Sequence, residues 1–315
     1  MFSYSVAIRT LGTAGAKYQK TLDGLARQKI KPTNIYVYIP YGYALPKETI
    51  GIEKYIRCKK GMITQRAQKY EQIQDEWILF LDDDVYLPSD YSERAMSFVT
   101  NSNADVLVSQ IFSEGKTLHN IVVSAMNFVF PMISKLWGLK ISYCGRYYYN
   151  IKPKYEFMKT NTGSGACSLC RKSTYLDIQF EDERWMDDFG YALGDDQLFH
   201  YKMYKKGANE YVWFNSGVVH LDAGSQTRVI NEAHIRKTSA CLFLVWYRSI
   251  YEPSNKVKKL FSFLCFMLSL TSRLLFSFIY IYHKLWMAPL AVLIGTFDAV
   301  KLVMSAPYKS YPPFC

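Results

Sequence analysis

Short apolar runs and amphipathic stretches alternate along the first 111 residues of the chain. The apolar runs, which are rich in β-branched and aromatic residues, predict strands at 4–10, 35–39, 55–58, 77–81 and 105–111. Between them, apolar residues three or four positions apart predict helices at about 18–26, 62–74 and 90–99. Strands separated by such helices are typical of βαβ units with right-handed crossovers. The pattern therefore predicts an α/β fold, with a doubly wound, mostly parallel sheet flanked by helices.

One of these strands, from Trp77 to Leu81, runs directly into three carboxylates at 82–84. A run without charge predicts a strand buried on both faces. Ligands of open α/β sheets bind beyond the carboxyl ends of the strands, and adjacent carboxylates repel one another unless a cation lies between them. Asp82 and Asp84 are two residues apart and point to one side, which predicts a divalent metal carrying a phosphate, manganese or magnesium. The alternative is a solvated acidic turn before the helix that starts near Asp90.

Further polar candidates follow in the second half of the chain. Gly163 and Gly165 lie in a glycine-rich segment, where the backbone can approach a ligand closely. Asp195 and Asp196 begin a predicted helix, where acids also serve simply to stabilise the helix dipole. These residues are therefore candidates for a site that the acidic strand alone does not complete.

Two single side chains have two interpretations each. His220 ends a short strand pattern and is either a nitrogen ligand for the metal or a hydrogen-bonding surface group. Trp185, together with Phe180, forms either a platform for an acceptor sugar or part of the core.

Composition narrows the functional classes. The 315 residues, half of them apolar, suffice for one large α/β domain with an appendage. The net charge is +11, but the basic residues are scattered and no nucleic-acid-binding motif contains them, so an anionic lipid surface or substrate fits better than nucleic acid. Seven dispersed cysteines and an opening Met-Phe-Ser-Tyr without a cleavable leader favour a reducing compartment.

The end of the chain has a different character. Two apolar helices are predicted at 260–282 and 285–304, but Arg273 lies at the centre of the first and Pro289 interrupts the second. Polar residues share one stripe of the first helix: Ser262, Ser269, Arg273, Ser277 and Lys284. With basic residues at 256–259, the pattern predicts membrane-associated helices lying in the cytoplasmic leaflet. The alternative is two buried helices packed on the preceding domain.

An apolar stretch in the middle of the chain, at about 117–139, is interrupted by Pro131. It is predicted to be either a core segment or part of a membrane-facing rim. We expect a catalytic domain at 1–252, with a nucleotide-sugar half at about 1–112, an apolar insertion at about 113–157 and an acceptor half at about 158–252. The tail would occupy 253–315.

The order and spacing of these motifs resemble the family 2 glycosyltransferases of the GT-A fold, of the kind that builds bacterial surface polysaccharides. The resemblance covers about residues 4–250 and rests on Asp82-Asp83-Asp84, the glycine-rich segment, Gly194-Asp195-Asp196 and His220. It departs from the family at Asp195, where glutamate is usual, and at 40–43, where relatives often have an acid-Gly-Ser turn. Residues 246–251 also resemble an Arg-Asn-containing helix of lipid-linked-glycan transferases, with Ser249 in place of the asparagine.

The residues and the resemblance together give each candidate a role. Those for the nucleotide sugar are Arg9, Thr10, Arg66, Asp82 and Asp83. Those for the metal are Asp84, Asp82 and His220, and the acceptor candidates are Gly163, Gly165 and Trp185. Asp196 is the expected base, with Asp195 beside it, and because adjacent acids titrate as a pair the two could exchange roles.

The expected chemistry follows from these groups. A metal held by carboxylates neutralises the leaving diphosphate, and a carboxylate accepts the proton of the acceptor hydroxyl. A single displacement inverts the anomeric centre. We therefore expect an inverting, metal-dependent glycosyltransferase that uses a nucleotide-sugar donor, UDP-linked, and a lipid-linked or oligosaccharide acceptor at the cytoplasmic face of the cell membrane. The alternatives are a non-catalytic membrane-attached module that binds a nucleotide or glycan, and a nucleotidyltransferase, for which residues 11–16 offer only a faint phosphate loop.

Overall fold

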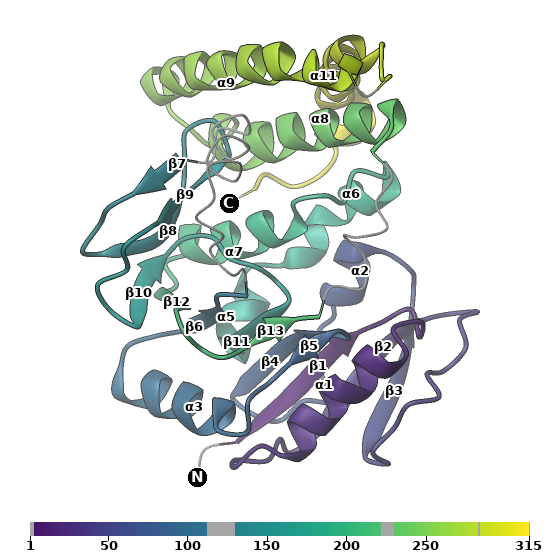
Figure 1. Ribbon diagram of the computed structural model, residues 1–315, viewed down its shortest axis with the longest axis vertical. Helices are drawn as coiled ribbons and strands as arrows, with labels where there is room; N and C mark the ends of the chain where they lie inside the picture. Colours follow the sequence, from purple (N-terminus) through teal and green to yellow (C-terminus); the bar gives the residue numbers. More distant parts are fainter. Residues whose placement is uncertain (1–2, 112–129, 222–229, 283, 315) are drawn as a thin grey trace.

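The computed structural model describes residues 3–111, 130–221, 230–282 and 284–314. Its main sheet has the strand order β3-β2-β1-β4-β11-β6-β12-β10-β8-β9-β7 (Figure 1). The strands of this sheet are β1 Tyr4–Arg9, β2 Ile35–Pro40, β3 Glu53–Cys58, β4 Trp77–Asp82, β6 Val106–Ser109, β7 Phe130–Met132, β8 Trp137–Ile141, β9 Tyr147–Asn150, β10 Phe157–Thr160, β11 Cys167–Arg171 and β12 Glu210–Trp213. A small second sheet pairs β5 Val85–Tyr86 with β13 Val219–His220.

The predicted fold class is confirmed. Strands β3, β2, β1 and β4 run parallel, and β11 runs antiparallel between β4 and β6. The helices on the sheet are α1 Ala16–Ala26, α2 Met62–Arg66, α3 Tyr91–Asn101, α5 Lys172–Asp177, the 3-10 turn η1 Phe180–Arg184, α6 Trp185–Asp188 and α7 Asp195–Lys205. The result is a mixed, mostly parallel sheet with helices on both faces (Figure 1).

Strand β4 is buried on both faces, as its uncharged sequence predicts. Ile78 and Phe80 belong to the core that contains α7. Leu79 and Leu81 alternate with them and belong to the opposite core, beneath α1 and α3. This central position places the acids at the end of β4 in the middle of the sheet edge where the parallel strands terminate.

The prediction of a helix at 62–74 is wrong in length, because α2 ends at Arg66. Tyr70 has a φ of 50° and leaves the helical path. Two tyrosine hydroxyls, those of Tyr70 and Tyr175, donate to the Arg66 carbonyl at 2.8 Å each. Tertiary partners thus satisfy the carbonyl that a longer helix would have used.

The segment predicted as an insertion contributes strands to the sheet wherever the structure describes it. Strand β8 pairs with β10, and β9 and β7 extend the edge beyond it. The apolar stretch at 117–139 lies only partly within the described residues, because 112–129 fall outside them. The proposed domain boundaries remain a prediction.

The tail helices form an outer layer over α8 Glu232–Trp246 (Figure 1). They are α9 Lys256–Ser277, α10 Ile279–Tyr282, α11 Ala288–Met304 and α12 Ala306–Lys309, and a π-helical turn, η2 Tyr247–Tyr251, precedes them. Helix α11 crosses α8 closely at Gly295, where a Cβ would collide with the Arg236 carbonyl. The Arg236 Nε also donates to Asp298 at 2.6 Å.

The polar stripe predicted on α9 faces the domain. Ser262, Ser269, Arg273 and Ser277 are buried, while the opposite face of the helix exposes leucine and phenylalanine side chains. Lys284 does not belong to the stripe, because it follows the end of α10 and is exposed. Within the described ranges, one helical stretch, Lys256–Tyr282, is long and apolar enough to cross a membrane. The alternative of helices packed on the domain describes the buried face of α9, and membrane association of its exposed face stays a prediction.

Candidate functional site

The carboxyl ends of β1 and β4 bring Arg9 and Asp82 together. The two residues are register partners in the parallel pair, and Arg9 Nε donates to Asp82 Oδ1 at 2.7 Å. Next to them, the Thr10 hydroxyl donates to the Asp83 carboxylate. Burial raises the pKa of Asp83 to about 6. Asp83 is thus fastened to the domain, separately from the carboxylate of Asp82.

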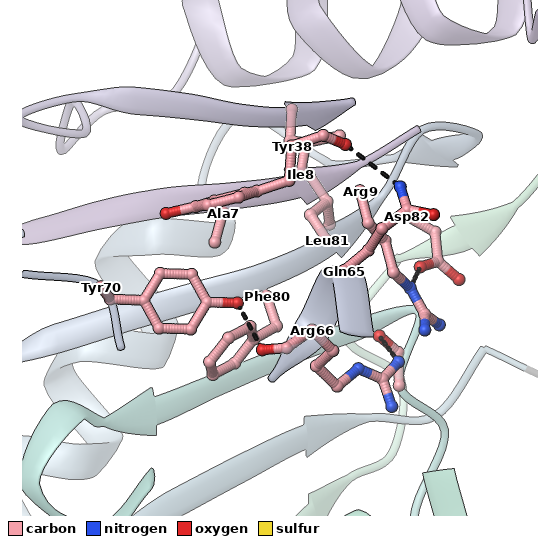
Figure 2. Close-up of a pocket in the computed structure, with 11 residues that line it drawn as sticks. Ala7, Ile8, Arg9, Tyr38, Gln65, Arg66, Tyr70, Phe80, Leu81 and Asp82 are labelled. Carbon is pink, nitrogen blue, oxygen red and sulfur yellow. Dashed lines mark hydrogen bonds and ion pairs between the residues drawn. The ribbon is translucent and has the colours of Figure 1, made fainter. Parts of the chain in front are cut away.

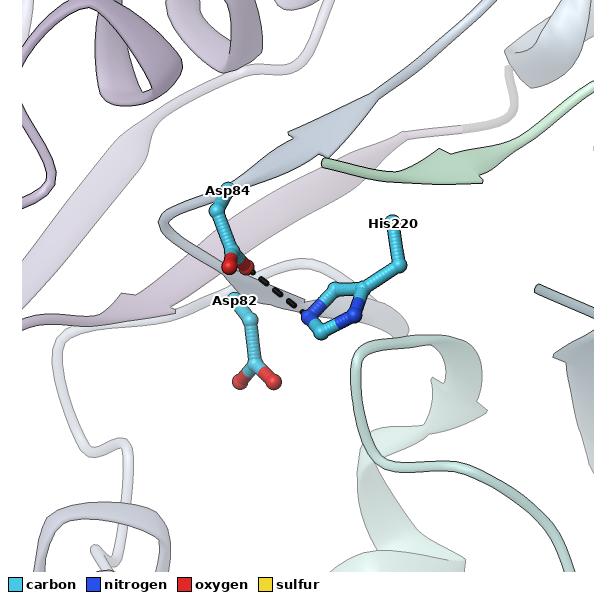
Figure 3. Close-up of side chains that lie close together, drawn as sticks. All are labelled: Asp82, Asp84 and His220. Atoms are coloured by element: carbon cyan, nitrogen blue, oxygen red, sulfur yellow. Dashed lines mark ion pairs between the residues drawn. The ribbon is translucent and has the colours of Figure 1, made fainter. Parts of the chain in front are cut away.

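Asp82, Asp84 and His220 form a group with the donor atoms of a metal site (Figure 3). The antiparallel pairing of β13 with β5 places His220 opposite Val85, and His220 Nε2 lies 3.0 Å from Asp84 Oδ1. One potential ligand atom from each residue lies within 4.8 Å of the other two. Ligand atoms around one cation at about 2.1 Å are separated by at most about 4.2 Å, so a small closing movement suffices. Two carboxylates and one imidazole are a donor set that can hold a divalent metal ion.

Two arginines, Arg9 and Arg66, lie between the potential metal ligands described above and the acids at the start of α7. Arg66 Nη1 lies 2.6 Å from Asp196 Oδ1 and 3.2 Å from Asp195 Oδ2. Arg9 Nη1 donates to Asp195 Oδ2 at 3.1 Å, and its Nη2 lies 3.8 Å from Asp196 Oδ1. The predicted donor-binding and catalytic residues therefore meet in one network, although 130 positions of sequence separate Arg66 from Asp196.

The neighbouring acids of α7 occupy different environments. Asp195 is buried, with 7% of its side chain exposed, whereas Asp196 exposes 30%. Burial and the charge of Asp196 raise the pKa of Asp195. Burial also acts to raise the pKa of Asp196, but the charges of Arg66 and Arg9 outweigh it and hold that pKa well below its usual range. Asp196 is consequently the ionised and more accessible carboxylate of the pair.

Gly165 allows Arg66 and Asp196 to approach one another. A Cβ at this position would collide with the Arg66 guanidinium and with Asp196 Oδ1. The other predicted glycine, Gly163, lies against Val108 of β6, 2.6 Å from where its Cβ would be. The two glycines thus accommodate the protein's own side chains at close range, and their acceptor role remains a prediction.

A small cavity lies beneath the network, between β1, β2, β4 and α2 (Figure 2). Its lining includes Arg9, Arg66 and Asp82, together with two residues that the sequence analysis did not single out, Gln65 and Tyr70. Gln65 Nε2 donates to the Thr10 carbonyl at 3.1 Å and so fastens α2 to the end of β1. No local motif marks this residue, because its partner is a backbone atom 55 positions away.

Asp187 is a second residue without a predicted role. Its carboxylate accepts from the backbone N–H of Thr64 at 2.8 Å and from that of Ile63 at 3.3 Å. These are orphan donors in the first turn of α2. Asp187 therefore holds the short helix that carries Arg66.

The sugar-platform role of Trp185 does not agree with its position. The ring is fully buried in the core, and its Nε1 donates to Glu183 at 2.9 Å. Phe180 is buried in the same core. The alternative, a structural tryptophan, describes this residue.

Residues 246–251, which resemble a helix of the lipid-linked-glycan transferases, also contain an arginine with a structural role. Arg248 is 2% exposed and donates to both carboxylate oxygens of Glu183, at 3.0 and 3.1 Å. Lys202 pairs with the same carboxylate at 3.0 Å. Arg248 therefore faces a buried ion cluster and is not directed toward an acceptor.

Comparisons with known proteins give one match in sequence and several in structure. Residues 50–178 match the family model "Glycosyl transferase family 2", a segment that contains Arg66, the acids at 82–84 and Gly165. No curated protein matches the sequence.

The similar solved structures are distant. S. aureus TarS shares 14% identity over 84% of this chain and 43% of its own, with a TM-score of 0.48, so the chain spans less than half of that protein. The TarS 1–349 fragment, in complex with UDP-GlcNAc, shares 14% identity over 86% of this chain and 73% of its own, with a TM-score of 0.46. The mannosyltransferase PcManGT from Pyrobaculum calidifontis, in complex with GDP-Man and Mn2+, shares 12% identity over 98% and 82%, with a TM-score of 0.49.

Proposed function

We propose that this chain, in which residues 50–178 match glycosyl transferase family 2, is an inverting, metal-dependent glycosyltransferase that moves a sugar from a UDP-linked donor to a lipid-linked glycan. The observation that carries the proposal is the meeting of two groups at one sheet edge. One is the metal group of Asp82, Asp84 and His220, and the other is the network of Arg9 and Arg66 with the acids of α7.

The charges at the carboxyl edge of the sheet favour the binding of a divalent cation and of an anionic donor. Three carboxylates, those of Asp82, Asp195 and Asp196, share two guanidiniums, and a fourth, that of Asp84, lies against His220. Asp82, Asp84 and His220 would hold manganese or magnesium, which neutralises the charge that develops on the diphosphate leaving group. Arg9 and Arg66 have the planar donor geometry that pairs with phosphate oxygens.

The proton transfer is assigned to Asp196. Its partly exposed carboxylate can reach an acceptor hydroxyl, whereas Asp195 is buried and orients both arginines. Asp196 accepts the hydroxyl proton as the oxygen bonds to the anomeric carbon and the diphosphate departs from the opposite side. A single displacement of this kind inverts the anomeric configuration.

Arg66 links donor binding to the base. Its guanidinium holds Asp196 in the present structure, and the donor's phosphates would compete for the same nitrogens. When Arg66 turns to the diphosphate, Asp196 loses a neighbouring cation and its pKa rises toward the range of a useful base. The order of binding would then be donor first and acceptor second.

A non-catalytic module remains the second candidate, and one observation favours it. The low pKa of Asp196 makes the carboxylate a weak proton acceptor as long as both arginines contact it. A module of this kind would bind a nucleotide sugar without transferring the sugar.

The tail supports a location at a membrane surface. Helices α9 and α11 expose leucine and phenylalanine on their outer faces, and three lysines lie at the start of α9. Apolar side chains together with a basic approach supply the two signals that stable membrane attachment needs. We place the protein at the cytoplasmic face of the cell membrane, as a peripheral or monotopic enzyme of polysaccharide biosynthesis.

A variant of the metal group tests the proposal. Asp84→Asn keeps the shape of the side chain but removes a charged ligand, so manganese-dependent release of nucleoside diphosphate and manganese-dependent nucleotide binding should both be lost. A panel of nucleotide sugars gives the first readout, and calorimetry with UDP, with and without manganese, gives the second. Asp90→Asn, an acid at the start of α3, is the control. Equal UDP affinity with and without manganese in the parent protein would refute the metal assignment.

A further inference from the structure

Arg273 on α9 is a buried cation without a counter-ion among the described residues. Its side chain is 8% exposed, and none of its three guanidinium nitrogens has a hydrogen-bond partner there. The guanidinium carbon lies 5.8 Å from the centre of the Phe266 ring, which is a weak compensation. Burying an unpaired charge costs several kcal/mol, and a bound anion would offset this cost. Protein groups in the described part of the chain do not supply such an anion.

A second arginine makes the surroundings more positive. Removal from water and then repulsion from Arg146 lower the pKa of Arg273 to about 10. Arg146 lies in the turn between β8 and β9 and is partly exposed, and burial lowers the pKa of its guanidinium as well. Two neighbouring guanidiniums are the arrangement that binds phosphate through several charge-assisted hydrogen bonds.

The turn that carries Arg146 is fixed against the tail. The Tyr143 carbonyl accepts from Ser262 Oγ of α9 at 2.8 Å and from Trp246 Nε1 of α8 at 3.1 Å. Gly145 lies against the same tryptophan, 2.8 Å from the Trp246 Cβ to where its own Cβ would be. The backbone segments that carry the two arginines are therefore packed against one another, unlike a chance cluster of surface charges.

The arginine pair is connected by packing to the catalytic acids. Gly194, which precedes Asp195, lies against Val245 of α8, 2.9 Å from where its Cβ would be. The next residue, Trp246, contacts the turn at Gly145 and stacks on Phe266, the ring beneath Arg273. The start of α7 and the arginine pair thus share the α8 residues Val245 and Trp246.

We propose that Arg273 and Arg146 bind the phosphate or diphosphate of the membrane lipid that carries the acceptor glycan. This inference rests on the proposed function and names the part of the acceptor that the tail recognises. The apolar outer face of α9 supports a lipid over a soluble phosphate, because it lies on the same helix as Arg273 and would contact the hydrocarbon chain. The phosphate chemistry is common to both sources, and the experiment separates them.

Vesicle binding by the full-length protein tests the site without any sugar nucleotide. The vesicles are phosphatidylcholine containing either a long-chain polyprenyl phosphate or the matching polyprenol. The parent protein should bind the phosphate vesicles about tenfold more tightly, the effect of one good charge-assisted pair. Arg273→Gln should reduce this preference to within about twofold, and Arg273→Lys should retain part of it. Lys301→Gln, which removes one exposed charge from α11, is the matched control and should keep the preference.

Thermal unfolding provides the second readout. Replacing an unpaired buried cation relieves its desolvation, so Arg273→Met should melt at a higher temperature than the parent in the absence of lipid. Polyprenyl phosphate should raise the melting temperature of the parent and not that of the variant. A variant that melts lower than the parent would indicate an internal counter-ion and would overturn the proposal.

Two further outcomes would also overturn it. Equal stabilisation by inorganic pyrophosphate, with no preference between the two vesicles, would assign the pair to soluble phosphate. An equal loss of vesicle binding in Arg273→Gln and Lys301→Gln would mean that the net charge of the protein, and not Arg273 itself, determines vesicle binding. Because no nucleotide sugar is present, a failure of the catalytic assignment leaves these results interpretable, and calorimetry with UDP and manganese should give the same affinity for Arg273→Gln as for the parent.

Discussion

Asp195 and Asp196 are chemically identical neighbours whose surroundings give them different properties. Asp195 is buried between two guanidiniums and its pKa is raised, while the more exposed Asp196 is held ionised by the same arginines. Gly165 makes this possible, because any side chain there would separate Arg66 from Asp196. At the residue scale, the difference between the two acids is therefore one of position rather than of type.

The residue-scale prediction concerns Asp196→Asn. The amide keeps the size of the carboxylate but cannot accept the proton, so kcat should fall by about 10²–10⁴, the usual contribution of a positioned base. Donor affinity should not weaken, because Arg66 loses its internal partner and remains available to the phosphates. Steady-state kinetics with saturating donor and calorimetry with UDP give the two quantities.

Asp188→Asn, at an acid of α6 with 46% of its side chain exposed, is the control for Asp196→Asn and should retain the parent kcat. A kcat of Asp196→Asn within about tenfold of the parent would transfer the role of base to Asp195. A retained anomeric configuration in the product, measured from proton coupling constants, would contradict a single displacement.

At the scale of elements, α7 contacts the sheet through a buried side-chain pair as well as through the two acids at its start. His200 of α7 and Glu210 of β12 are both fully buried, and His200 Nδ1 lies 3.1 Å from Glu210 Oε2. Burial raises the pKa of Glu210 to about 7, and the charge of Asp105 acts in the same direction, against the lowering effect of His200. This pair connects the helix that presents Asp195 and Asp196 to the strand beside β6.

The element-scale prediction is a pH dependence of stability. The folded state holds a proton on Glu210 more tightly than the unfolded state, so this contribution to stability is complete below about pH 4.5 and is lost as the pH rises through about 7. Glu210→Gln imitates the protonated form and should gain stability relative to the parent between pH 5 and pH 8, by at most about 3 kcal/mol.

Urea unfolding of both proteins at pH 5 and pH 8 measures this difference. Glu71→Gln, at an exposed glutamate, is the control and should show no relative gain. An unchanged difference between Glu210→Gln and the parent across this range would mean that Glu210 titrates as it does in the unfolded chain.

For the molecule as a whole, the tail is part of the folded domain as well as a candidate membrane surface. Arg248 Nη2 donates to the Pro312 carbonyl at 2.6 Å, and Phe314 is 1% exposed. Removal of the chain after Glu252 would therefore uncover the core around α8, and loss of membrane binding in such a truncation would not be specific. The exposed face of α9 provides a cleaner test.

The prediction for the whole molecule concerns Leu264→Glu combined with Leu268→Glu. Both leucines are more than half exposed on α9, so the pair should keep the parent melting temperature. Each leucine contributes about 2 kcal/mol when its side chain leaves water, and the double variant should therefore move from the membrane to the soluble fraction.

The double variant Leu45→Glu with Leu176→Glu, at exposed leucines of the domain, is the control and should remain bound to the membrane. Carbonate extraction separates an interfacial helix, which it releases, from a spanning one. Membrane binding by both double variants would mean that the exposed face of α9 is not the surface that attaches to the membrane.

The sequence by itself determined the elements whose signal is local. The uncharged run of β4 predicted a central strand, and the acids that follow it placed a polar site at the carboxyl edge of a mostly parallel sheet. Periodicity and composition also located the tail helices. These inferences succeed because strand and helix patterns report directly on which side of an element is buried.

Only the tertiary structure decided which side chains meet and which face a given residue presents. Trp185 and Arg248 belong to sequence patterns that suggest ligand binding, but packing places both in the core around Glu183. Helix α2 ends at Arg66, whose carbonyl accepts from the hydroxyls of the nearby Tyr70 and the distant Tyr175, and the serines of α9 face inward with Arg273. The contacts of Tyr175 with Arg66 and of Arg248 with Glu183 join residues 109 and 65 positions apart. No local pattern encodes such contacts, since their free energy depends on burial and partners that exist only after the chain has folded.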